Sequence, residues 1–322
     1  MPGFKHILCV LTDLQDVDEV IAHAMHVCET HTAKLSVLLT MEPLPPNANM
    51  VMESFTYIDT SQSMHTAAGE HLQSMANKWR ERMPLEATLR IGHAFVEIAK
   101  YAVECSADLV LKVAKTDLLD RLFGHEDIRL LRKCPAPVWL IHRGDTQDYK
   151  KVVAAVDVNY HYPDDELAIR KQLNETVVIQ AAQVAVHENA SLHIVHVIDD
   201  PVDLVVYDGI VDIAASTQQN QDDIEQERFN DLDALKDLIC SANPDEVVDA
   251  LKIETHVLHG IARRDIPQWI AELNTDLLVM GTVARVGIPG FFMGNTAESI
   301  LNQVECSVLA LKPHGFESPL IT

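Results

Sequence analysis

The sequence predicts an α/β protein built from two tandem, doubly wound parallel-sheet (Rossmann-like) domains. Short apolar runs rich in Val, Ile, Leu and Ala alternate with segments of helical periodicity along the whole chain. Hydrophobic residues make up 48% of the chain but aromatic residues only 5%, which is typical of buried parallel strands. The same order of segments then occurs a second time, so we expect one domain in two copies.

The first repeat occupies residues 1–146. Its apolar runs are too short for helices, whereas the segments between them place apolar residues three and four positions apart. The predicted strands are 5–13, 34–39, 86–91, 108–113 and 138–141, and the predicted helices are 18–30, 63–81, 94–105 and 126–133. The proline-containing segment 41–60 is predicted to be an irregular excursion.

The second repeat occupies residues 147–322 and begins in the polar, turn-rich segment 143–148. The predicted strands are 150–157, 191–198, 253–257, 277–280 and 306–311, and the predicted helices are 173–187, 222–240, 265–273 and one that starts near residue 295. The acidic segment 200–221 is a second excursion. The two repeats share residues as well as the order of their segments: Asp108-Leu109-Val110-Leu111 of the first matches Asp276-Leu277-Leu278-Val279 of the second. We therefore infer an internal duplication.

The charge of the chain restricts its partners. The formal net charge is −23, and residues 1–146 carry 14 Lys/Arg against 19 Asp/Glu, while the rest carries 11 against 29. A field of this sign argues against nucleic acid and anionic membrane as partners. We see no apolar run as long as a membrane span and no secretory signal, so we expect a cytoplasmic protein.

Cysteine and histidine patterns do not predict a metal site. The six cysteines form no Cys-x-x-Cys pair, and we interpret them as small buried hydrophobes in a reducing compartment. His23 and His26 share a helix face, and His193 and His196 share a strand. We find no carboxylate or cysteine that completes a recognisable ligand set around either pair. We therefore predict no dedicated metal site.

The sharpest chemical signal is a buried strand at 277–280 followed by a glycine-rich loop and a helix start. Gly281, Gly287 and Gly294 allow positive φ angles or a close approach of the backbone to a ligand. Asn295 is the predicted N-cap of the helix that follows. Free amides at a glycine-lined helix start form a natural site for a phosphate group.

Three further residues complete a candidate nucleotide site. Asp157 ends the first strand of the second repeat, where a switch point of the sheet brings it close to the glycine loop and where it could bind ribose hydroxyls or Mg²⁺. Arg285 could pair with a phosphate, and backbone groups near Val197 could bind an adenine edge. The alternatives are an aspartate that only begins a loop and a solvated loop cation.

The first repeat lacks this chemistry. Val113 stands where the second repeat has Gly281, and residues 114–123 contain no glycine. Glu126 and Asp127 follow the retained Gly124 and would repel a phosphate at the positive end of their helix. We predict that the first domain does not bind a triphosphate.

The duplicated layout and two motifs resemble the universal stress protein family, in particular its tandem-domain E-type members, over essentially the whole chain. The motifs are Asp157 at the end of a strand and Gly281-x-x-Ala284-nine residues-Gly294-Asn295-Thr296. The resemblance implies a pseudo-dimer of the two domains and ATP binding, with Mg²⁺ accompanying the nucleotide. The candidate nucleotide-binding residues are Asp157, Val197, Gly281, Thr282, Arg285, Gly287, Gly294, Asn295 and Thr296. The chain departs from the family motif at Ala284 and Asn295, where a glycine and a hydroxyl residue are usual.

Two functions from different classes follow. The first is a stress-response protein that binds adenine nucleotide in its second domain and acts by conformation or by binding protein partners, as a monomeric pseudo-dimer or a homodimer. We expect at most slow ATP hydrolysis, because no nucleophile, phosphate-binding lysine loop or acid–base pair is visible. The alternative is a scaffold or apolar-ligand binder with a decayed nucleotide site, for which the patch 288–293 could supply the surface. A pyrophosphatase-like enzyme would need a Ser-Gly-Gly-type loop, and 156–159 offers none.

Overall fold

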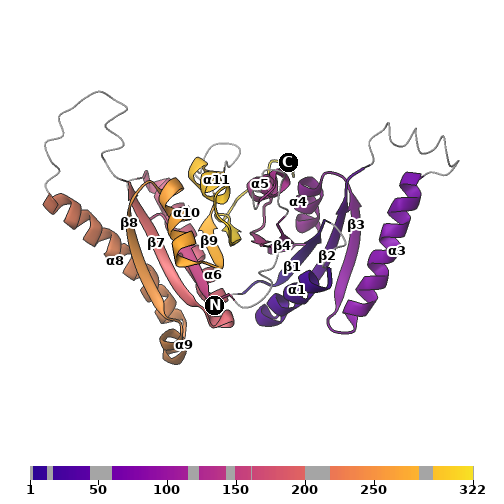
Figure 1. The fold of residues 1–322 in the computed structure, drawn as a ribbon, viewed down its shortest axis with the longest axis horizontal. Helices are drawn as coiled ribbons and strands as arrows, with labels where there is room; N and C mark the ends of the chain where they lie inside the picture. The colour runs from indigo at the N-terminus through magenta and orange to yellow at the C-terminus, as the bar shows by residue number, and fades with distance from the viewer. Residues whose placement is uncertain are drawn as a thin grey trace, which may run out of the picture. The chain divides into compact units, whose positions relative to one another are not determined.

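The computed structural model describes residues 3–12, 17–43, 60–114, 123–142, 149–160, 162–199, 218–282 and 293–321. The chain folds into two compact units, the first made mainly of residues 2–146 and the second mainly of residues 147–317. The last described residues, 318–321, belong to the first unit, where the Ser318 hydroxyl donates a hydrogen bond of 2.6 Å to the Lys133 carbonyl. Figure 1 shows the elements of both units.

The first unit alternates strands and helices as predicted. Its strands are β1 (His6–Leu11), β2 (Lys34–Met41), β3 (Leu85–Ile91), β4 (Leu109–Val113) and β5 (Val138–Ile141), and its helices are α1 (Val17–His31), α3 (Thr60–Arg80), α4 (Ala94–Glu104) and α5 (His125–Lys133). The strands pair in the order β3-β2-β1-β4-β5, and each described pairing is parallel. Most of the excursion predicted at 41–60 lies outside the described residues.

The second unit repeats this order. Its strands are β6 (Lys151–Ala155), β7 (Ser191–Asp199), β8 (Ile253–Gly260), β9 (Leu277–Gly281) and β10 (Ser307–Leu311), and its helices are α6 (Asp164–Glu188), α8 (Gln218–Ala242), α9 (Asp245–Ala250), α10 (Ala262–Leu273) and α11 (Asn295–Leu301). The strands pair in parallel in the order β10-β9-β6-β7-β8, the counterpart of the first unit. The predicted doubly wound parallel fold is confirmed.

Three helices of the second unit differ most from the predictions. Helix α6 begins at Asp164 rather than at residue 173, because its first turns are polar and show no apolar stripe in the sequence. Helix α9 was not predicted, and α8 begins at Gln218 instead of residue 222. Most of the excursion predicted at 200–221 lies outside the described residues.

Helix α10 contains Pro267, yet it continues to Leu273. A proline inside a helix has no N–H for the carbonyl four residues earlier, here that of Arg263. The side-chain amide of Gln303, two residues after the last residue of α11, donates to this carbonyl over 2.9 Å. The packing of α11 against α10 thus supplies the missing hydrogen bond.

An aspartate of the repeated Asp-Leu motif has the same structural role in both units. Asp108 accepts hydrogen bonds of 2.8 and 2.9 Å from the backbone N–H groups of Lys5 and His6, at the start of β1. Asp276 accepts bonds of 2.7 and 2.8 Å from the N–H groups of Lys150 and Lys151, at the start of β6. In both units, the aspartate of the shared motif therefore joins the fourth strand to the first through hydrogen bonds.

Residues in the left-handed conformation also recur at matching places. Thr32 (φ 54°) and Asn189 (φ 52°) follow the first helix of each unit, and Ser106 (φ 57°) and Asn274 (φ 54°) follow the helix before the fourth strand. Asparagine tolerates this conformation, whereas a β-branched residue such as threonine is strained there. The first unit thus carries the less suitable residue at both positions.

We expect Thr32→Asn to stabilise the first unit by about 0.5–1 kcal/mol, because it transfers the second unit's residue to a position with φ of 54°. Urea unfolding of the full chain measures the change. Thr30→Asn is the matched control and should have almost no effect, since residue 30 lies inside α1 and the two residues have similar helix propensities. Equal shifts in both variants would contradict the conformational explanation.

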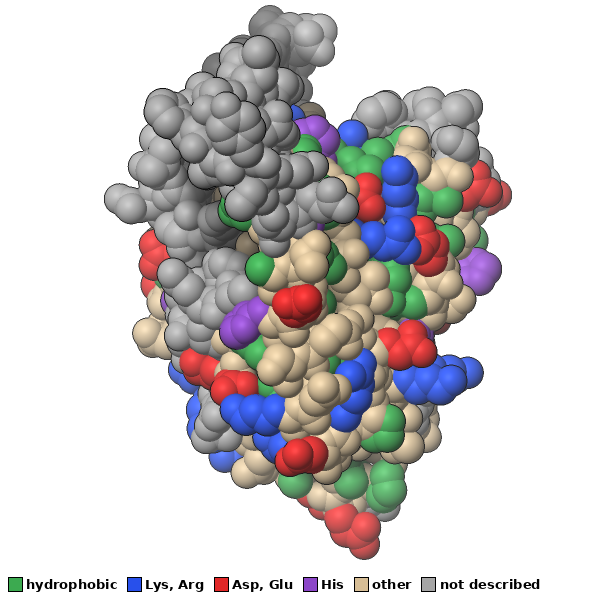
Figure 2. All heavy atoms as spheres, turned by 90° about the vertical axis from the view of Figure 1, so that its right-hand side faces the viewer, with side chains coloured by type: hydrophobic (Ala, Val, Ile, Leu, Met, Phe, Trp, Pro, Cys, Tyr) green, Lys and Arg blue, Asp and Glu red, His purple; other side chains and the backbone are tan. Residues whose placement is uncertain are grey.

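The strands form the core, and the surface carries charges of both signs. Ile7, Leu8, Val152 and Val153 are fully buried, as expected for central parallel strands. Figure 2 shows the side on which α3 lies in Figure 1, where basic side chains stand among acidic ones. Within the described residues, no helix combines the length and the apolar character needed to cross a bilayer.

All six cysteines are free, and four of them are buried. Burial raises the pKa of the Cys28 thiol to about 12, with the charge of Glu29 acting in the same direction. Such a thiol stays protonated near neutral pH and packs as a small apolar side chain. The interpretation of the cysteines as buried hydrophobes therefore holds for most of them, while Cys105 and Cys240 are half-buried.

Candidate functional site

The predicted nucleotide site lies at the carboxyl edge of the second unit's sheet. Strands β6 and β9 are neighbours, and the chain order reverses between them, so this is the switch point of the sheet. Asp157 follows the end of β6, and Gly281 and Thr282 end β9 and begin the next loop. Val197 lies near the end of β7, on the other side of β6. The fold thus brings these four residues to one edge.

The Asp157 carboxylate already has several hydrogen-bond partners. Its Oδ1 accepts the Asn159 N–H over 3.1 Å, and its Oδ2 accepts the Tyr162 hydroxyl over 3.2 Å and the Arg170 guanidinium over 3.1 Å. A carboxylate offers about four acceptor positions, and this side chain is 44% exposed. Asp157 can therefore accept a further hydrogen bond, such as one from a ribose hydroxyl.

The unpredicted first turns of α6 build the wall beside Asp157. Arg170 is only 18% exposed and is held between Asp157 and Glu166, whose Oε1 accepts bonds of 2.9 and 2.7 Å from it. Its guanidinium stacks over the Tyr162 ring at 3.8 Å. The Asn174 amide donates to the Asp157 carbonyl over 2.7 Å. The sequence analysis missed Arg170 because it placed this part of the chain before the helix.

Gly281 packs closely against helix α6. A Cβ placed on it would stand 2.6 Å from Leu173 Cδ2 and 3.0 Å from Leu173 Cγ, so the Leu173 side chain would have to move to admit a larger residue. Gly281 is not among the residues with positive φ. A helix of the same unit thus approaches this glycine closely, and the expected role of Gly281 beside a ligand stays a prediction.

Thr282 joins three elements and is fully buried. Its N–H and hydroxyl donate to the Leu311 carbonyl over 3.1 and 3.3 Å, and its carbonyl accepts the Gly294 N–H over 3.1 Å. The Lys312 ammonium donates to the Thr282 hydroxyl oxygen over 2.8 Å. Thr282 thus connects β9, β10 and the start of α11 by hydrogen bonds. Lys312 is a cation at this edge that was not predicted as a site residue.

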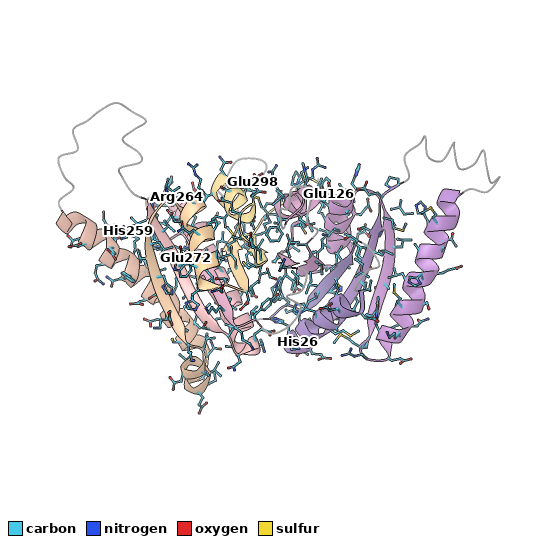
Figure 3. The ribbon with its side chains drawn as sticks, viewed as in Figure 1. His26, Glu126, His259, Arg264, Glu272 and Glu298 are labelled. Atoms are coloured by element: carbon cyan, nitrogen blue, oxygen red, sulfur yellow. The ribbon has the colours of Figure 1, made fainter. Side chains whose placement is uncertain are left out.

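Helix α11 begins one residue earlier than predicted. Gly294 is the N-cap and Asn295 the first helical residue, so the expectation that the Asn295 side chain caps the helix is wrong. The Glu298 N–H donates to the Gly294 carbonyl, which leaves the amides of residues 295–297 without a partner inside the helix. Asn295 and Thr296 are exposed. Figure 3 shows Glu298 and Arg264 near the starts of α11 and α10.

The remaining predicted site residues cannot be placed. Arg285 and Gly287 lie outside the described residues, as do Ala284 and most of the apolar patch 288–293. Met293, the last residue of that patch, is buried.

The corresponding place in the first unit holds a buried ion pair. Lys112 on β4 and Asp127 on α5 are 4% and 1% exposed, and the ammonium donates a hydrogen bond of 2.6 Å to the carboxylate. Asp127 is the third residue after the N-cap glycine of α5, and Ala297 is the third residue after that of α11. Lys112 is the fourth residue of β4, and Met280 is the fourth residue of β9, the corresponding strand of the second unit. An internal cation and anion thus stand where the second unit has two apolar side chains.

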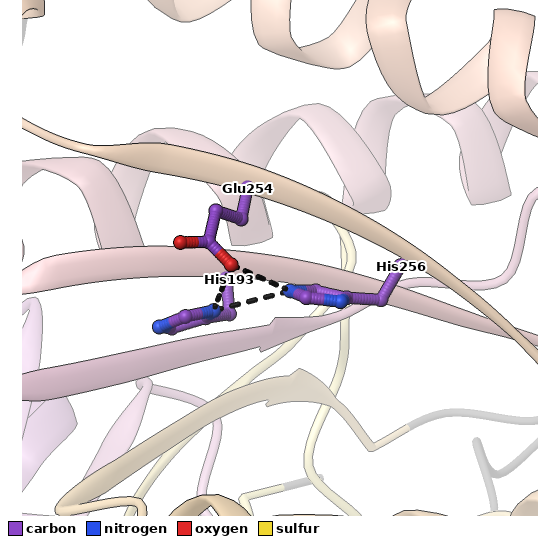
Figure 4. A group of neighbouring side chains, drawn as sticks. All are labelled: His193, Glu254 and His256. Atoms are coloured by element: carbon purple, nitrogen blue, oxygen red, sulfur yellow. Dashed lines mark hydrogen bonds and ion pairs between the residues drawn. The ribbon is translucent and has the colours of Figure 1, made fainter.

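A second group of polar side chains was missed by the sequence analysis. His193 and His196 point to opposite faces of β7, because they are three residues apart in a strand. His193 instead meets Glu254 and His256 of β8, and the three side chains converge (Figure 4). The conclusion that no carboxylate accompanies His193 is therefore wrong. The pattern Glu254-x-His256 in the predicted strand 253–257 could have indicated this group, because the two side chains point to the same face of a strand.

The fold and the carboxyl edge of the second unit's sheet define a class of protein. Its members have two copies of a parallel α/β domain, with a loop and a helix start at the switch point of the sheet. The universal stress protein family model matches residues 3–142 and again 148–312. The chain therefore belongs to the universal stress protein family, with two of its domains in tandem.

Full-length relatives have the same organisation. The chain is 26% identical over 335 residues to universal stress protein E of Photorhabdus laumondii and 28% identical over 338 residues to universal stress protein E of Salmonella typhi. Each match covers 99% of this chain and 98% of the relative. The resemblance to tandem-domain members is confirmed.

Solved structures agree with this fold. A crystal structure of a functionally unknown protein from Pseudomonas aeruginosa PAO1 matches with a TM-score of 0.69 and 22% identity, over 97% of this chain and 94% of that one. A universal stress protein from Archaeoglobus fulgidus matches with a TM-score of 0.63 and 16% identity, over 95% and 98%. At these identities the matches concern the fold alone.

Proposed function

We propose that the second domain binds an adenine nucleotide, ATP with Mg²⁺, and that the protein acts in the stress response through conformation or partner binding. The observation that carries this proposal is the position of Asp157 and the start of α11 on either side of the switch point between β6 and β9. A carboxylate suits ribose hydroxyls, and amides of a first helical turn that have no partner inside the helix suit phosphate oxygens. Family membership supports the same ligand class.

The acidic character of the chain makes the cation essential. Residues 147–322 carry 29 acidic against 11 basic residues, so a triphosphate approaches against a repulsive field. Lys312 and the amides of residues 295–297 offset part of this repulsion, and Mg²⁺ would neutralise part of the triphosphate. We expect nucleotide binding to depend on Mg²⁺.

We propose binding rather than rapid turnover. The polar side chains placed at the edge are held in structural bonds: Thr282 joins strands and helix, and Arg170 is fixed between two carboxylates. A general base requires a titratable group within reach of the attacking water. Asp157, a carboxylate at this edge, is bound to Arg170 and Tyr162. We place this function in the cytoplasm, where free cysteines such as these persist.

Calorimetry of the full chain with ATP and Mg²⁺ tests the proposal. We expect Thr296→Glu to weaken ATP binding at least tenfold, about 1.4 kcal/mol, because it places a carboxylate in the exposed first turn of α11. The first unit has Glu126 at the matching position. An acid there favours the helix by about 0.3–1 kcal/mol, so weaker binding would not reflect unfolding.

Thr296→Gln is the matched control, since glutamine has the size of glutamate without its charge. We expect it to bind ATP within about threefold of the unchanged protein, a difference below 1 kcal/mol. Equal losses in both variants would mean that charge at this turn is irrelevant. No heat at millimolar ATP would contradict nucleotide binding and favour the scaffold alternative.

A further inference from the structure

We propose that His193, Glu254 and His256 form a binding site for one divalent transition-metal ion, and zinc suits these ligands best. The three side chains come from the amino-terminal halves of β7 and β8, at the opposite end of the strands from Asp157 and Thr282. The site is thus separate from the candidate nucleotide site. Two imidazoles and a carboxylate are an established ligand set for zinc, with a fourth position left for water.

The spacing of the ligand atoms fits a tetrahedral ion. His193 Nδ1 and His256 Nε2 are 3.1 Å apart, and Glu254 Oε2 lies 3.7 Å from each nitrogen (Figure 4). Bonds of about 2.0–2.2 Å to a tetrahedral zinc ion separate neighbouring ligands by about 3.3–3.5 Å. The carboxylate oxygen stands beyond hydrogen-bond distance of both nitrogens, yet at the spacing of ligands that share an ion.

The strand register sets this arrangement. His193 and Glu254 are direct partners in the parallel pairing of β7 and β8, and His256 follows Glu254 by two residues on the same face. All three side chains therefore stand on rigid strands instead of loops. A metal site on paired strands is positioned without ordering a flexible segment.

The Ser191 hydroxyl fixes the ring of His193. The Ser191 hydroxyl donates to the Lys150 carbonyl over 3.3 Å, and its oxygen lies 3.0 Å from His193 Nε2. Since that hydroxyl proton is used, His193 Nε2–H is the donor and Nδ1 carries the lone pair. A histidine ligand whose other N–H is bonded to an oxygen is the usual arrangement around a metal.

The site is covered on one side and open on the other. Trp269 of α10 covers one side, with its ring 4.8 Å from that of His256 and 6.4 Å from that of His193. Glu254 is 61% exposed, so the fourth position faces solvent.

Cobalt spectroscopy and zinc calorimetry on the untagged full chain test this site. We expect one equivalent of Zn²⁺ to bind at micromolar concentration or tighter, and Co²⁺ to give the intense visible absorption of tetrahedral coordination. Glu254→Gln and His256→Gln change part-exposed side chains, so both variants should fold. Each should weaken Zn²⁺ binding by more than about 100-fold, which exceeds the usual effect of changing a residue that only contacts a metal ligand, and abolish the cobalt bands.

His259→Gln is the matched control. His259 lies on the same strand and also pairs with a carboxylate, Glu225, at 3.3 Å. We expect this variant to bind Zn²⁺ and Co²⁺ as the unchanged protein does. Equal losses in the control and in Glu254→Gln, weak binding without a defined stoichiometry, or only the pale spectrum of octahedral cobalt would overturn the proposal.

Discussion

Asp127→Ala is expected to lower the unfolding free energy of the first unit by about 3–5 kcal/mol, the usual cost of leaving one member of a buried ion pair without its partner. Lys112 is 4% exposed, and apart from Asp127 its ammonium donates to the Val113 carbonyl over 3.1 Å. The alanine would leave a positive charge inside the protein with no anion beside it among the described residues. The loss should therefore exceed that of a surface substitution several-fold.

A second substitution at Lys112 should restore the stability that Asp127→Ala removes. The double variant Lys112→Met, Asp127→Ala gives the first unit the two residue types that the second unit has at the matching positions, Met280 and Ala297, which are 5% and 7% exposed. Replacing a buried ion pair by apolar residues is often neutral or stabilising. We expect the double variant to recover most of the stability lost by Asp127→Ala alone.

Urea unfolding followed by tryptophan fluorescence measures both effects. Trp79 and Trp139 lie in the first unit and Trp269 in the second, so a Trp269→Phe background reports on the first unit alone. Glu126→Gln is the control, because its pair with Arg129 is 43–46% exposed and should contribute less than about 1 kcal/mol. A double variant as unstable as Asp127→Ala would show that the apolar pair of the second unit does not fit the first.

Gly281→Val is expected to destabilise the second unit by about 1–3 kcal/mol, the typical cost of overpacking. Valine is the residue of the first unit at this place, Val113, which is half-buried. In the second unit the new Cβ would stand 2.6 Å from Leu173 Cδ2. The two units differ in the helix that follows the first strand, α1 in the first unit and α6 in the second. Both helices end at a residue in the left-handed conformation, but α6 has 25 residues and α1 has 15. Helix α6 therefore extends about 15 Å farther toward this edge.

Leu173→Ala should rescue Gly281→Val, because it removes the atoms that the new side chain would meet. The double variant is expected to be at least about 1 kcal/mol more stable than the sum of the single changes. Hydrogen exchange of β9 and β6 amides measures the effect within the second unit. Additive losses would mean that the glycine is needed for a reason other than the approach of α6.

Most of the architecture could be predicted from the sequence because its signals are local. Apolar runs such as 277–280 and helical spacings such as that of 94–105 are properties of adjacent residues, and both became elements at nearly the predicted places. The duplication was visible in letters around Asp108 and Asp276. The start of α6 was not visible, because its polar first turns are held by Arg170 and Leu173, whose partners lie on other elements.

The candidate site was predictable only in part. Asp157, Gly281 and Thr282 reach one edge because the order of parallel strands fixes which ends are neighbours. The roles of all nine candidate residues in binding a nucleotide stay predictions, as does the pseudo-dimer of the two domains. The packing role of Gly281 depends on a helix more than a hundred residues earlier, which no local pattern indicates.

By itself, the sequence determined the alternation of strands and helices, their duplication and the position of the switch point, since each follows from hydrophobic period and chain order. Only the tertiary structure decided which side chains meet: Lys112 with Asp127, Leu173 with Gly281, and His193 with Glu254 and His256. The physical reason is that strand register and helix packing join residues that are distant in the chain, and single residues carry no signal of a partner that far away.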